Sequence, residues 1–144
     1  MNKKLLPLGL MLLSLSSVAA EFSVTKTSTP YPISGGARGH SLHRLMSTDY
    51  PTGQSMHAAR LRAVSWTATS YPQSTGERAE LCLQRQGGTL ECDYITPGSS
   101  GTMPIPDVGA WGYSSHIIIR HSHASGPYPS RPLGSDSVTF HMSY

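Results

Sequence analysis

The segment Ser137–Tyr144 reads SVTFHMSY and alternates polar with apolar side chains. In a β-strand, every second side chain points to the same face, so this alternation predicts a strand with one face in a core. The residues on that face are Val138, Phe140, Met142 and Tyr144. The pattern is the clearest amphipathic strand in the chain.

Two segments further back show the same kind of periodicity. In residues 56–71 the apolar parity changes near Ala63, which predicts a strand with a β-bulge at Ala63 and Val64. Trp66 follows the bulge on the core face. In residues 116–123, the run Ile117-Ile118-Ile119 is apolar on both faces, which is typical of a central strand.

The predicted strands are separated by stretches rich in proline, glycine and serine, at residues 28–39, 96–109 and 124–136. Such stretches form loops. The segment 124–136 is long for a loop in a compact domain, and loops of this length are usually functional or mobile. With no helix predicted, the pattern indicates an all-β chain, an antiparallel β-sandwich of six to eight short strands.

The start of the chain has the three parts of a secretory leader. Lys3 and Lys4 form a positive region, residues 5–15 are apolar apart from Pro7, Gly9 and Ser14, and small residues lead up to Ala20. The apolar run is shorter than the ~20 residues that a membrane-spanning helix needs. We therefore expect cleavage after Ala20, no stable membrane insertion, and one exported domain over residues 21–144.

The charge distribution bears on the class of partner. Removing Lys3 and Lys4 lowers the formal charge from +3 to +1 and leaves Lys26 as the single lysine. The arginines are scattered along the chain, whereas a nucleic-acid-binding protein concentrates its cations on one face. The sequence therefore predicts no nucleic-acid partner.

Residues 78–84 and 90–95 flank a glycine turn and predict a β-hairpin. Placing Cys82 opposite Cys92 allows a disulfide but puts the acids of the second strand on the apolar face of the first. A shift of one residue aligns the apolar residues and separates the cysteines across the sheet. We expect the disulfide, with one strand leaning outward, because cysteine pairs of exported proteins are usually oxidised. The C-x9-C spacing also differs from the C-x-x-C of redox and metal sites.

No catalytic motif is complete in this sequence. The nearest pair of acids, Glu91 and Asp93, lies two residues apart on one predicted strand, where solvated side chains are the simpler interpretation. A thiol nucleophile is excluded if Cys82 and Cys92 are paired. We expect no catalytic residues and no cofactor.

Histidines and aromatic residues are the candidate binding residues. His121 and His123 share a strand face after His116, and such a pair can bind zinc or copper given a third ligand; the alternative is exposed strand-end histidines, and we expect no metal. The candidate partner-binding residues are Trp111, Tyr113, Tyr128 and Tyr144. Trp111 lies in a Gly-Ala-Trp-Gly context, which makes it a candidate for a loop residue exposed to a partner; the alternative, which is commoner for a tryptophan, is packing in the core.

Residues 62–101 resemble the FlhE family of small periplasmic flagellar proteins. The resemblance rests on Val64-Ser65-Trp66, on the segment RAELC at 78–82, on Cys92 and on the segment GSSGT at 98–102. The leader, the chain length and the closing strand are also similar. The resemblance implies a non-enzymatic β-sandwich in the periplasm, with the flagellar export apparatus or flagellar structural subunits as partners. It further implies a chaperone-like action that limits proton leak through the export apparatus or premature filament assembly.

The sequence thus predicts a periplasmic flagellar accessory protein, and a periplasmic carbohydrate- or metal-binding module is the alternative. A β-sandwich can bind extended chains by strand addition or through its loops. The expected contact surfaces are the final strand, residues 138–144, and the loops around Trp111 and Tyr128.

Overall fold

The computed structural model describes residues 19–144. Nearly all of the predicted leader therefore lies outside the described residues. The elements are β1 (Glu21–Ser28), β2 (Gly39–His43), the 3-10 turn η1 (Ser47–Asp49), β3 (Arg60–Thr67), β4 (Arg78–Gln84), β5 (Leu90–Ile95), β6 (Ser100–Pro104), β7 (His116–Ser122) and β8 (Asp136–Ser143).

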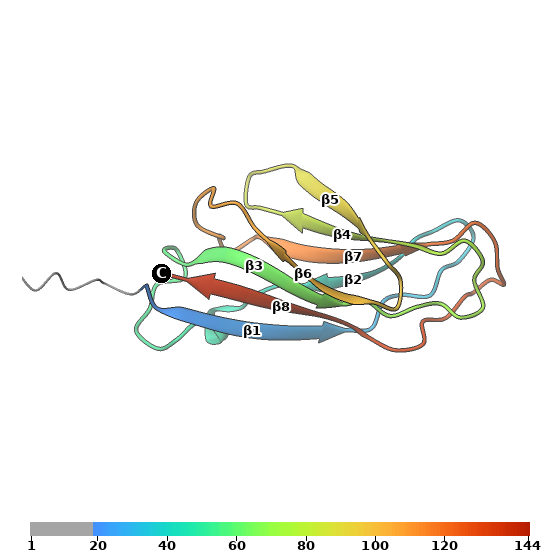
Figure 1. Ribbon diagram of the computed structural model, residues 1–144, viewed down its shortest axis with the longest axis horizontal. Helices are drawn as coiled ribbons and strands as arrows, with labels where there is room; N and C mark the ends of the chain where they lie inside the picture. The colour runs from blue at the N-terminus through green and yellow to red at the C-terminus, as the bar shows by residue number, and fades with distance from the viewer. Residues whose placement is uncertain (1–18) are drawn as a thin grey trace, which may run out of the picture.

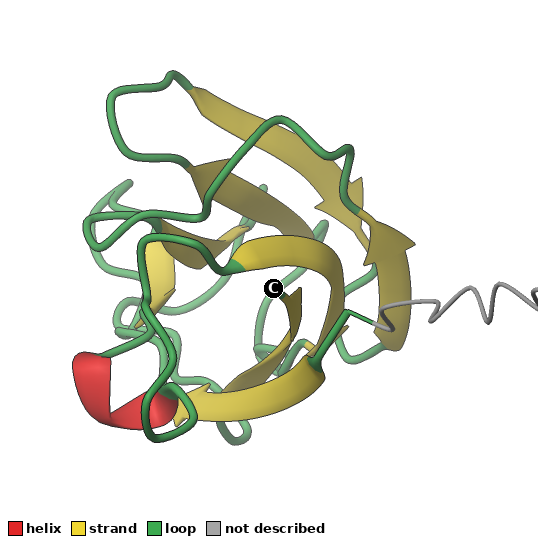
Figure 2. Cartoon of the chain, turned by 90° about the vertical axis from the view of Figure 1, so that its left-hand side faces the viewer, coloured by secondary structure: helices red, strands yellow, loops and turns green. Residues whose placement is uncertain are grey.

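The strands form two four-stranded antiparallel sheets, with the orders β1-β8-β3-β6 and β2-β7-β4-β5. The first sheet lies in front of the second in Figure 1. Seen end-on in Figure 2, the strands surround a common interior, and η1 lies at the periphery. The predicted antiparallel β-sandwich is confirmed. Among residues 19–144, no helix has the length and hydropathy to cross a membrane.

Strand β8 confirms the amphipathic pattern of the chain's last residues. Its side chains alternate between buried and partly exposed, with Val138, Phe140 and Met142 facing the interior. The strand lies between β1 and β3 and pairs with both. Because neither edge of β8 is open, the expectation that this strand binds a partner by strand addition is wrong.

Strand β3 contains the predicted bulge. Its register against β8 shifts between Leu61 and Ala63, so that Leu61 and Val64 both face the core. Trp66 packs against the core from a partly buried position, and its ring covers Gly101 of β6, where a Cβ would overlap the indole.

Strand β6 lies within residues 96–109, where the proline, glycine and serine content predicts a loop; that prediction is wrong for Ser100–Pro104. This short strand has no apolar alternation, because it pairs with β3 only and Gly101 must leave room for Trp66. Pairing through the backbone does not require an apolar side-chain pattern, so periodicity could not reveal it.

The β4–β5 hairpin has the register that places Cys82 opposite Cys92, and the two cysteines form a disulfide. Leu81 therefore faces the interior on the same side of the sheet as Asp93. The conflict between the two faces is resolved by position: β5 is an edge strand whose residues are almost all exposed, so its acids remain in solvent.

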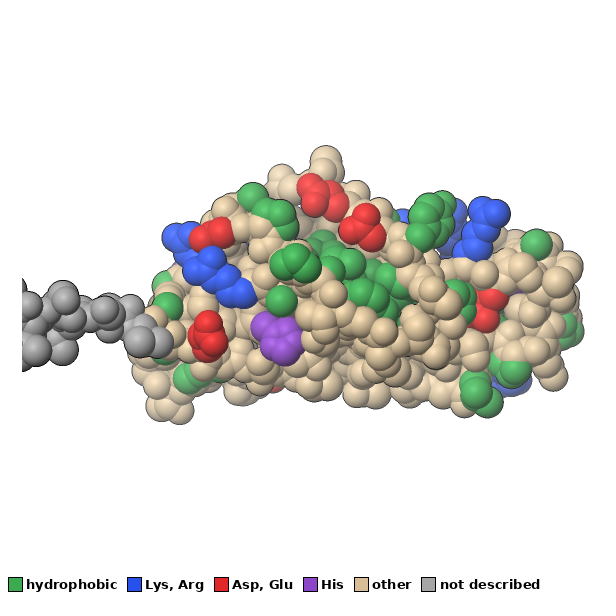
Figure 3. Space-filling model, viewed as in Figure 1, with side chains coloured by type: hydrophobic (Ala, Val, Ile, Leu, Met, Phe, Trp, Pro, Cys, Tyr) green, Lys and Arg blue, Asp and Glu red, His purple; other side chains and the backbone are tan. Residues whose placement is uncertain are grey.

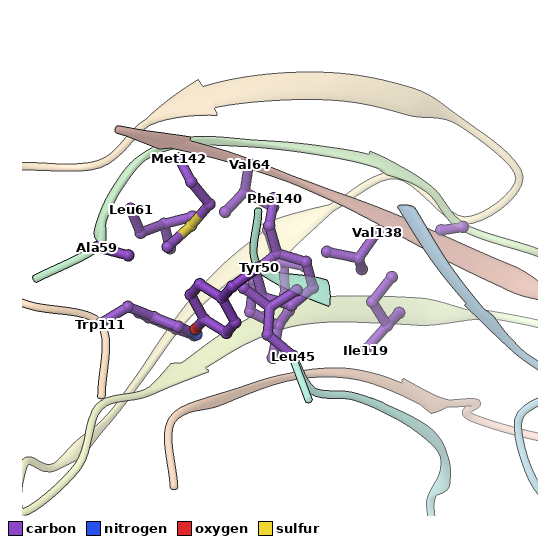
Figure 4. Close-up of a cluster of buried hydrophobic side chains, with 13 residues drawn as sticks. Leu45, Tyr50, Ala59, Leu61, Val64, Trp111, Ile119, Val138, Phe140 and Met142 are labelled. Carbon is purple, nitrogen blue, oxygen red and sulfur yellow. The ribbon is translucent and has the colours of Figure 1, made fainter. Parts of the chain in front are cut away.

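The apolar core lies between the sheets (Figure 4). Strands β3, β4, β7 and β8 supply most of it, and the segments before β3 and β7 close one end. Its buried members are Leu45, Tyr50, Ala59, Leu61, Val64, Ala68, Leu81, Trp111, Ile117, Ile119, Val138, Phe140 and Met142.

Candidate functional site

The candidate aromatic residues do not form one surface. Trp111 is 0% exposed, packs edge-on against Phe140 and lies under the guanidinium of Arg85. The interpretation of Trp111 as an exposed, partner-facing residue is therefore wrong, and the alternative, packing in the core, is confirmed. The backbone N–H of Trp111 donates to the carbonyl of Ala59, which holds this loop across the end of the core.

The candidate tyrosines differ in exposure and place. Tyr113 and Tyr128 are exposed, whereas Tyr144 is half-buried and stacked on Phe22. Tyr128 packs against His123 in the segment joining β7 to β8, at the end of the sandwich opposite the C-terminus (Figure 1). Whether these tyrosines contact a partner stays a prediction.

The three candidate histidines also have separate surroundings. His116 contacts the Ser114 carbonyl, and His123, which follows the end of β7, contacts the Ser74 hydroxyl. His121 is buried between the sheets. Among residues 19–144, no group of three or more His, Cys, Asp or Glu side chains is placed to hold a metal ion.

His121 belongs to a buried polar cluster that no motif of the sequence predicts. At its centre is Asp136, 0% exposed at the start of β8. Its carboxylate accepts hydrogen bonds from the Ser41 hydroxyl at 2.5 Å, from the Thr69 N–H at 2.8 Å and from His121 Nε2 at 3.1 Å. Four separate segments thus meet at one carboxylate.

The hydrogen bonds of the cluster determine which atoms carry protons. The single hydroxyl proton of Ser41 goes to Asp136, since a carboxylate only accepts. His43 Nε2, 3.0 Å from the Ser41 oxygen, must then be a donor. On the far side of the cluster, Glu77 lies 3.5 Å from Nδ1 of His121.

Burial and hydrogen bonding oppose each other at Asp136. Burial raises the pKa of Asp136, but the hydrogen bonds from His121, Ser41 and Thr69 together lower it by more. The pKa therefore lies below its ordinary value. At His43 burial is the largest effect and lowers the pKa, although the negative charge of Asp136 acts in the other direction. The fold therefore favours a charged Asp136 and a neutral His43.

Serine, histidine and aspartate are the residue types of a hydrolase triad, but this arrangement cannot act as one. A catalytic base must accept the proton of the nucleophile. Here the Ser41 proton goes to Asp136, and His43 donates to the Ser41 oxygen. Ser41 is also only 1% exposed. The cluster instead ties β2 and β7 of one sheet to β8 of the other. The sequence indicated this cluster only through polar residues at strand positions whose side chains face inward.

The open side of the sandwich lies between the edge strands β5 and β6 (Figure 1). A hollow of about 190 Å³ lies there, with an apolar floor and the two β5 acids on its wall. Figure 3 shows green apolar side chains in this region with acidic side chains above them. The hollow is lined by Leu83, Arg85, Glu91, Asp93, Met103, Pro104, Ile105, Pro106 and Val108.

The acids of β5 differ from most other acids of the chain. Five described carboxylates contact a basic side chain, namely Asp49, Glu77, Glu80, Asp107 and Asp136. Among residues 19–144, Glu21, Glu91 and Asp93 have no such contact. Two of these three lie on the same face of β5, which makes the open side a candidate binding surface for a cationic partner.

No protein-family model and no curated protein sequence matches the chain. At the level of structure, the chain is similar to a crystal structure of FlhE, with a TM-score of 0.50 and 15% identity over 88% of this chain and 98% of that one. A coat protein of tobacco streak virus follows with a TM-score of 0.46 and 6% identity, covering 92% and 90% of the two chains. The chain therefore has the fold of FlhE, and the resemblance noted in its sequence is confirmed at the level of the fold.

Proposed function

We propose that this chain is a non-enzymatic accessory protein of the bacterial flagellum that acts in the periplasm by binding. The observation that carries the proposal is the fold shared with FlhE along nearly the whole of both chains. A fold alone does not determine function. The resemblance of residues 62–101 to the FlhE family adds a second line of support that does not depend on the fold.

Two features support a periplasmic location. The first is the predicted leader, residues 1–20, which would leave residues 21–144 as a single exported domain. The second is the Cys82–Cys92 disulfide, since such bonds persist in oxidising compartments such as the periplasm.

Binding is the mode of action that the described residues favour. The buried polar cluster holds its serine, its histidines and the carboxylate of Asp136 away from any substrate. The open side between β5 and β6 instead offers an apolar hollow and two carboxylates that have no ion-pair partner among residues 19–144. We infer that this side contacts the export apparatus or flagellar structural subunits. Its action there would be to limit proton leak or premature filament assembly, in a chaperone-like manner.

A deletion strain of a motile host tests the proposal. We expect reduced motility together with filaments in the periplasm or a lowered cytoplasmic pH. Complementation with the full chain should restore the wild-type state, whereas a variant lacking residues 2–20 should not, because it stays in the cytoplasm. Wild-type motility, periplasm and cytoplasmic pH in the deletion strain would contradict the flagellar role.

A further inference from the structure

The outer edge of β5 has unpaired hydrogen-bonding groups. This strand pairs with β4 only. The Cα atoms of Cys82 and Cys92 are 4.0 Å apart, the short spacing of a pair that exchanges no backbone hydrogen bonds. The N–H and C=O groups of Cys92 therefore point away from β4, and so do those of Leu90 and Tyr94 by alternation. Within residues 19–144, no other backbone group bonds to them.

The other three sheet edges are less available. On β2, the carbonyl of His40 already accepts a bond from the Tyr31 N–H. On β1, Lys26 forms an ion pair with Asp49, and edge lysines discourage strand addition. Strand β6 has only five residues and ends at Pro104, which cannot donate. Strand β5 is therefore the edge best prepared to receive another strand.

The side chains of β5 determine what kind of strand fits. Glu91 and Asp93 project on the side of the hollow, whereas Leu90 and Tyr94 project on the opposite face and are 39% and 74% exposed. A second hollow, of about 440 Å³, lies beside Tyr94 and Ile95. A strand added to this edge would meet the carboxylates of Glu91 and Asp93 on one face and the side chains of Leu90 and Tyr94 on the other.

The backbone pattern brings opposing side chains closest at the two acids. An antiparallel strand that bonds to Cys92 meets Glu91 and Asp93 in pairs without backbone hydrogen bonds, where Cα atoms are ~4.5 Å apart. Opposite charges directly across such a pair stabilise it, and like charges destabilise it. Neutral residues opposite Glu91 and Asp93 would remove the two carboxylates from water without giving them a partner, which is unfavourable in free energy.

We propose that β5 is a docking edge for an extended peptide segment with Lys or Arg at alternate positions and apolar residues between them. The segment adds antiparallel to β5, with its cations opposite Glu91 and Asp93 and its apolar side chains beside Leu90 and Tyr94. A second copy of β5 is disfavoured as the occupant, because self-pairing centred on Cys92 sets Glu91 against Asp93. The inference deepens the proposed function by naming the chemistry of the partner, but it depends only on the purified protein.

A synthetic probe tests the docking edge. The peptide Ser-Lys-Val-Lys-Val-Lys-Ser, labelled with a fluorophore, is titrated with the protein and followed by fluorescence anisotropy. The scrambled peptide Ser-Lys-Lys-Lys-Val-Val-Ser has the same charge and composition without the alternation. We expect the alternating peptide to bind at least tenfold more tightly than the scrambled one. Methylation of its backbone nitrogens on the side facing β5 should abolish binding, because those groups form the added ladder.

Variants of the protein locate the site. The double variant Glu91→Gln, Asp93→Asn should lose at least tenfold in affinity. Glu21→Gln is the matched control, since within the described part of the chain that carboxylate also has no ion-pair partner but lies on β1. Thermal unfolding verifies that the double variant is folded. Equal affinity for both peptides, unchanged affinity in the double variant, or no binding at millimolar protein would each overturn the proposal. None of these results bears on the deletion phenotype, so the two proposals can fail separately.

Discussion

Strand β8 passes through two different interiors within one sandwich. Toward the C-terminus, Phe140 and Met142 lie in an apolar core under Trp111. At its start, two residues before Val138, Asp136 occupies the same inward row but lies in a polar cluster. Burial is complete at both ends, yet the physical requirements differ.

The two ends of β8 should respond differently to substitution. Apolar packing depends on volume and shape, and the loss from a truncation grows with the cavity left behind. A buried carboxylate depends on its hydrogen-bond donors, because removing one partner leaves the others desolvated and unpaired. The apolar end should therefore respond to the size of a side chain, and the polar end to single atoms.

The largest effect is expected at the apolar end. Trp111→Ala should lower the free energy of unfolding by about 3–5 kcal/mol, because a wholly buried ring is lost. Urea denaturation measures this, with Tyr113→Ala as control, since an exposed ring should change stability by no more than about 0.5 kcal/mol. Equal losses in the two variants would mean that Trp111 does not close the core.

At the polar end, Asp136→Asn conserves size and removes the charge. We expect a loss of about 2–3 kcal/mol at pH 7, because an amide nitrogen replaces an oxygen that accepts hydrogen bonds. The folded pKa of Asp136 lies below its ordinary value of 3.8, so its contribution is present above that pH and declines as the pH falls through the folded pKa. The difference in the free energy of unfolding between wild type and variant, from urea denaturation at several pH values, should therefore become smaller in acid. A difference that is independent of pH would contradict a charged, buried Asp136.

A single atom is tested by Ser41→Ala. Removal of the hydroxyl leaves Asp136 with one donor fewer and His43 Nε2 without its acceptor, so we expect a loss of about 1–2 kcal/mol. Ser137→Ala, on the outward face of the same β8, is the control and should be nearly neutral. If both substitutions lower the free energy of unfolding equally, the hydrogen bonds of Ser41 do not contribute to stability.

The smallest effect concerns pH near neutrality. The folded pKa of His43 is lowered from 6.5 by burial, so the unfolded chain binds the proton more readily and stability declines as the pH falls below about 6.5. His43→Gln removes this titration and keeps a donor near the Ser41 oxygen. The variant should show a shallower loss of stability between pH 7 and pH 5 in denaturation series. An unchanged slope would show that His43 does not titrate differently on folding.

Local pattern was sufficient for much of the sheet structure. Side chains of a strand alternate with a period of two, so residues adjacent in the sequence are enough to predict which of them share a face. This holds for the alternation of β8, the triple isoleucine of β7 and the parity change in β3. The Cys82–Cys92 disulfide could also be predicted, from the oxidised state of cysteine pairs in exported proteins, whereas the sequence left two registers of the hairpin open.

The remaining features depend on residues distant in the chain. Trp111 lies in a loop sequence but is buried, because its backbone bonds to Ala59 and its ring packs against Phe140. Strand β6 exists because β3 pairs with its backbone, which leaves no mark on side-chain periodicity. Neither contact can be inferred from the local sequence of the residue that makes it.

The sequence by itself determined the all-β class, the inward face of β8 and the central position of β7, because each depends on the alternation of neighbouring side chains. The hairpin register that brings Cys82 opposite Cys92 was one of two that the sequence allowed, and the tertiary structure selected it. Only the tertiary structure decided that Asp136 lies buried among Ser41, Thr69 and His121, and that β5 keeps an open edge. A buried charge is stable only when donors from other segments converge on it, and an edge is open only because no other strand covers it. Both are properties of the assembled sheets.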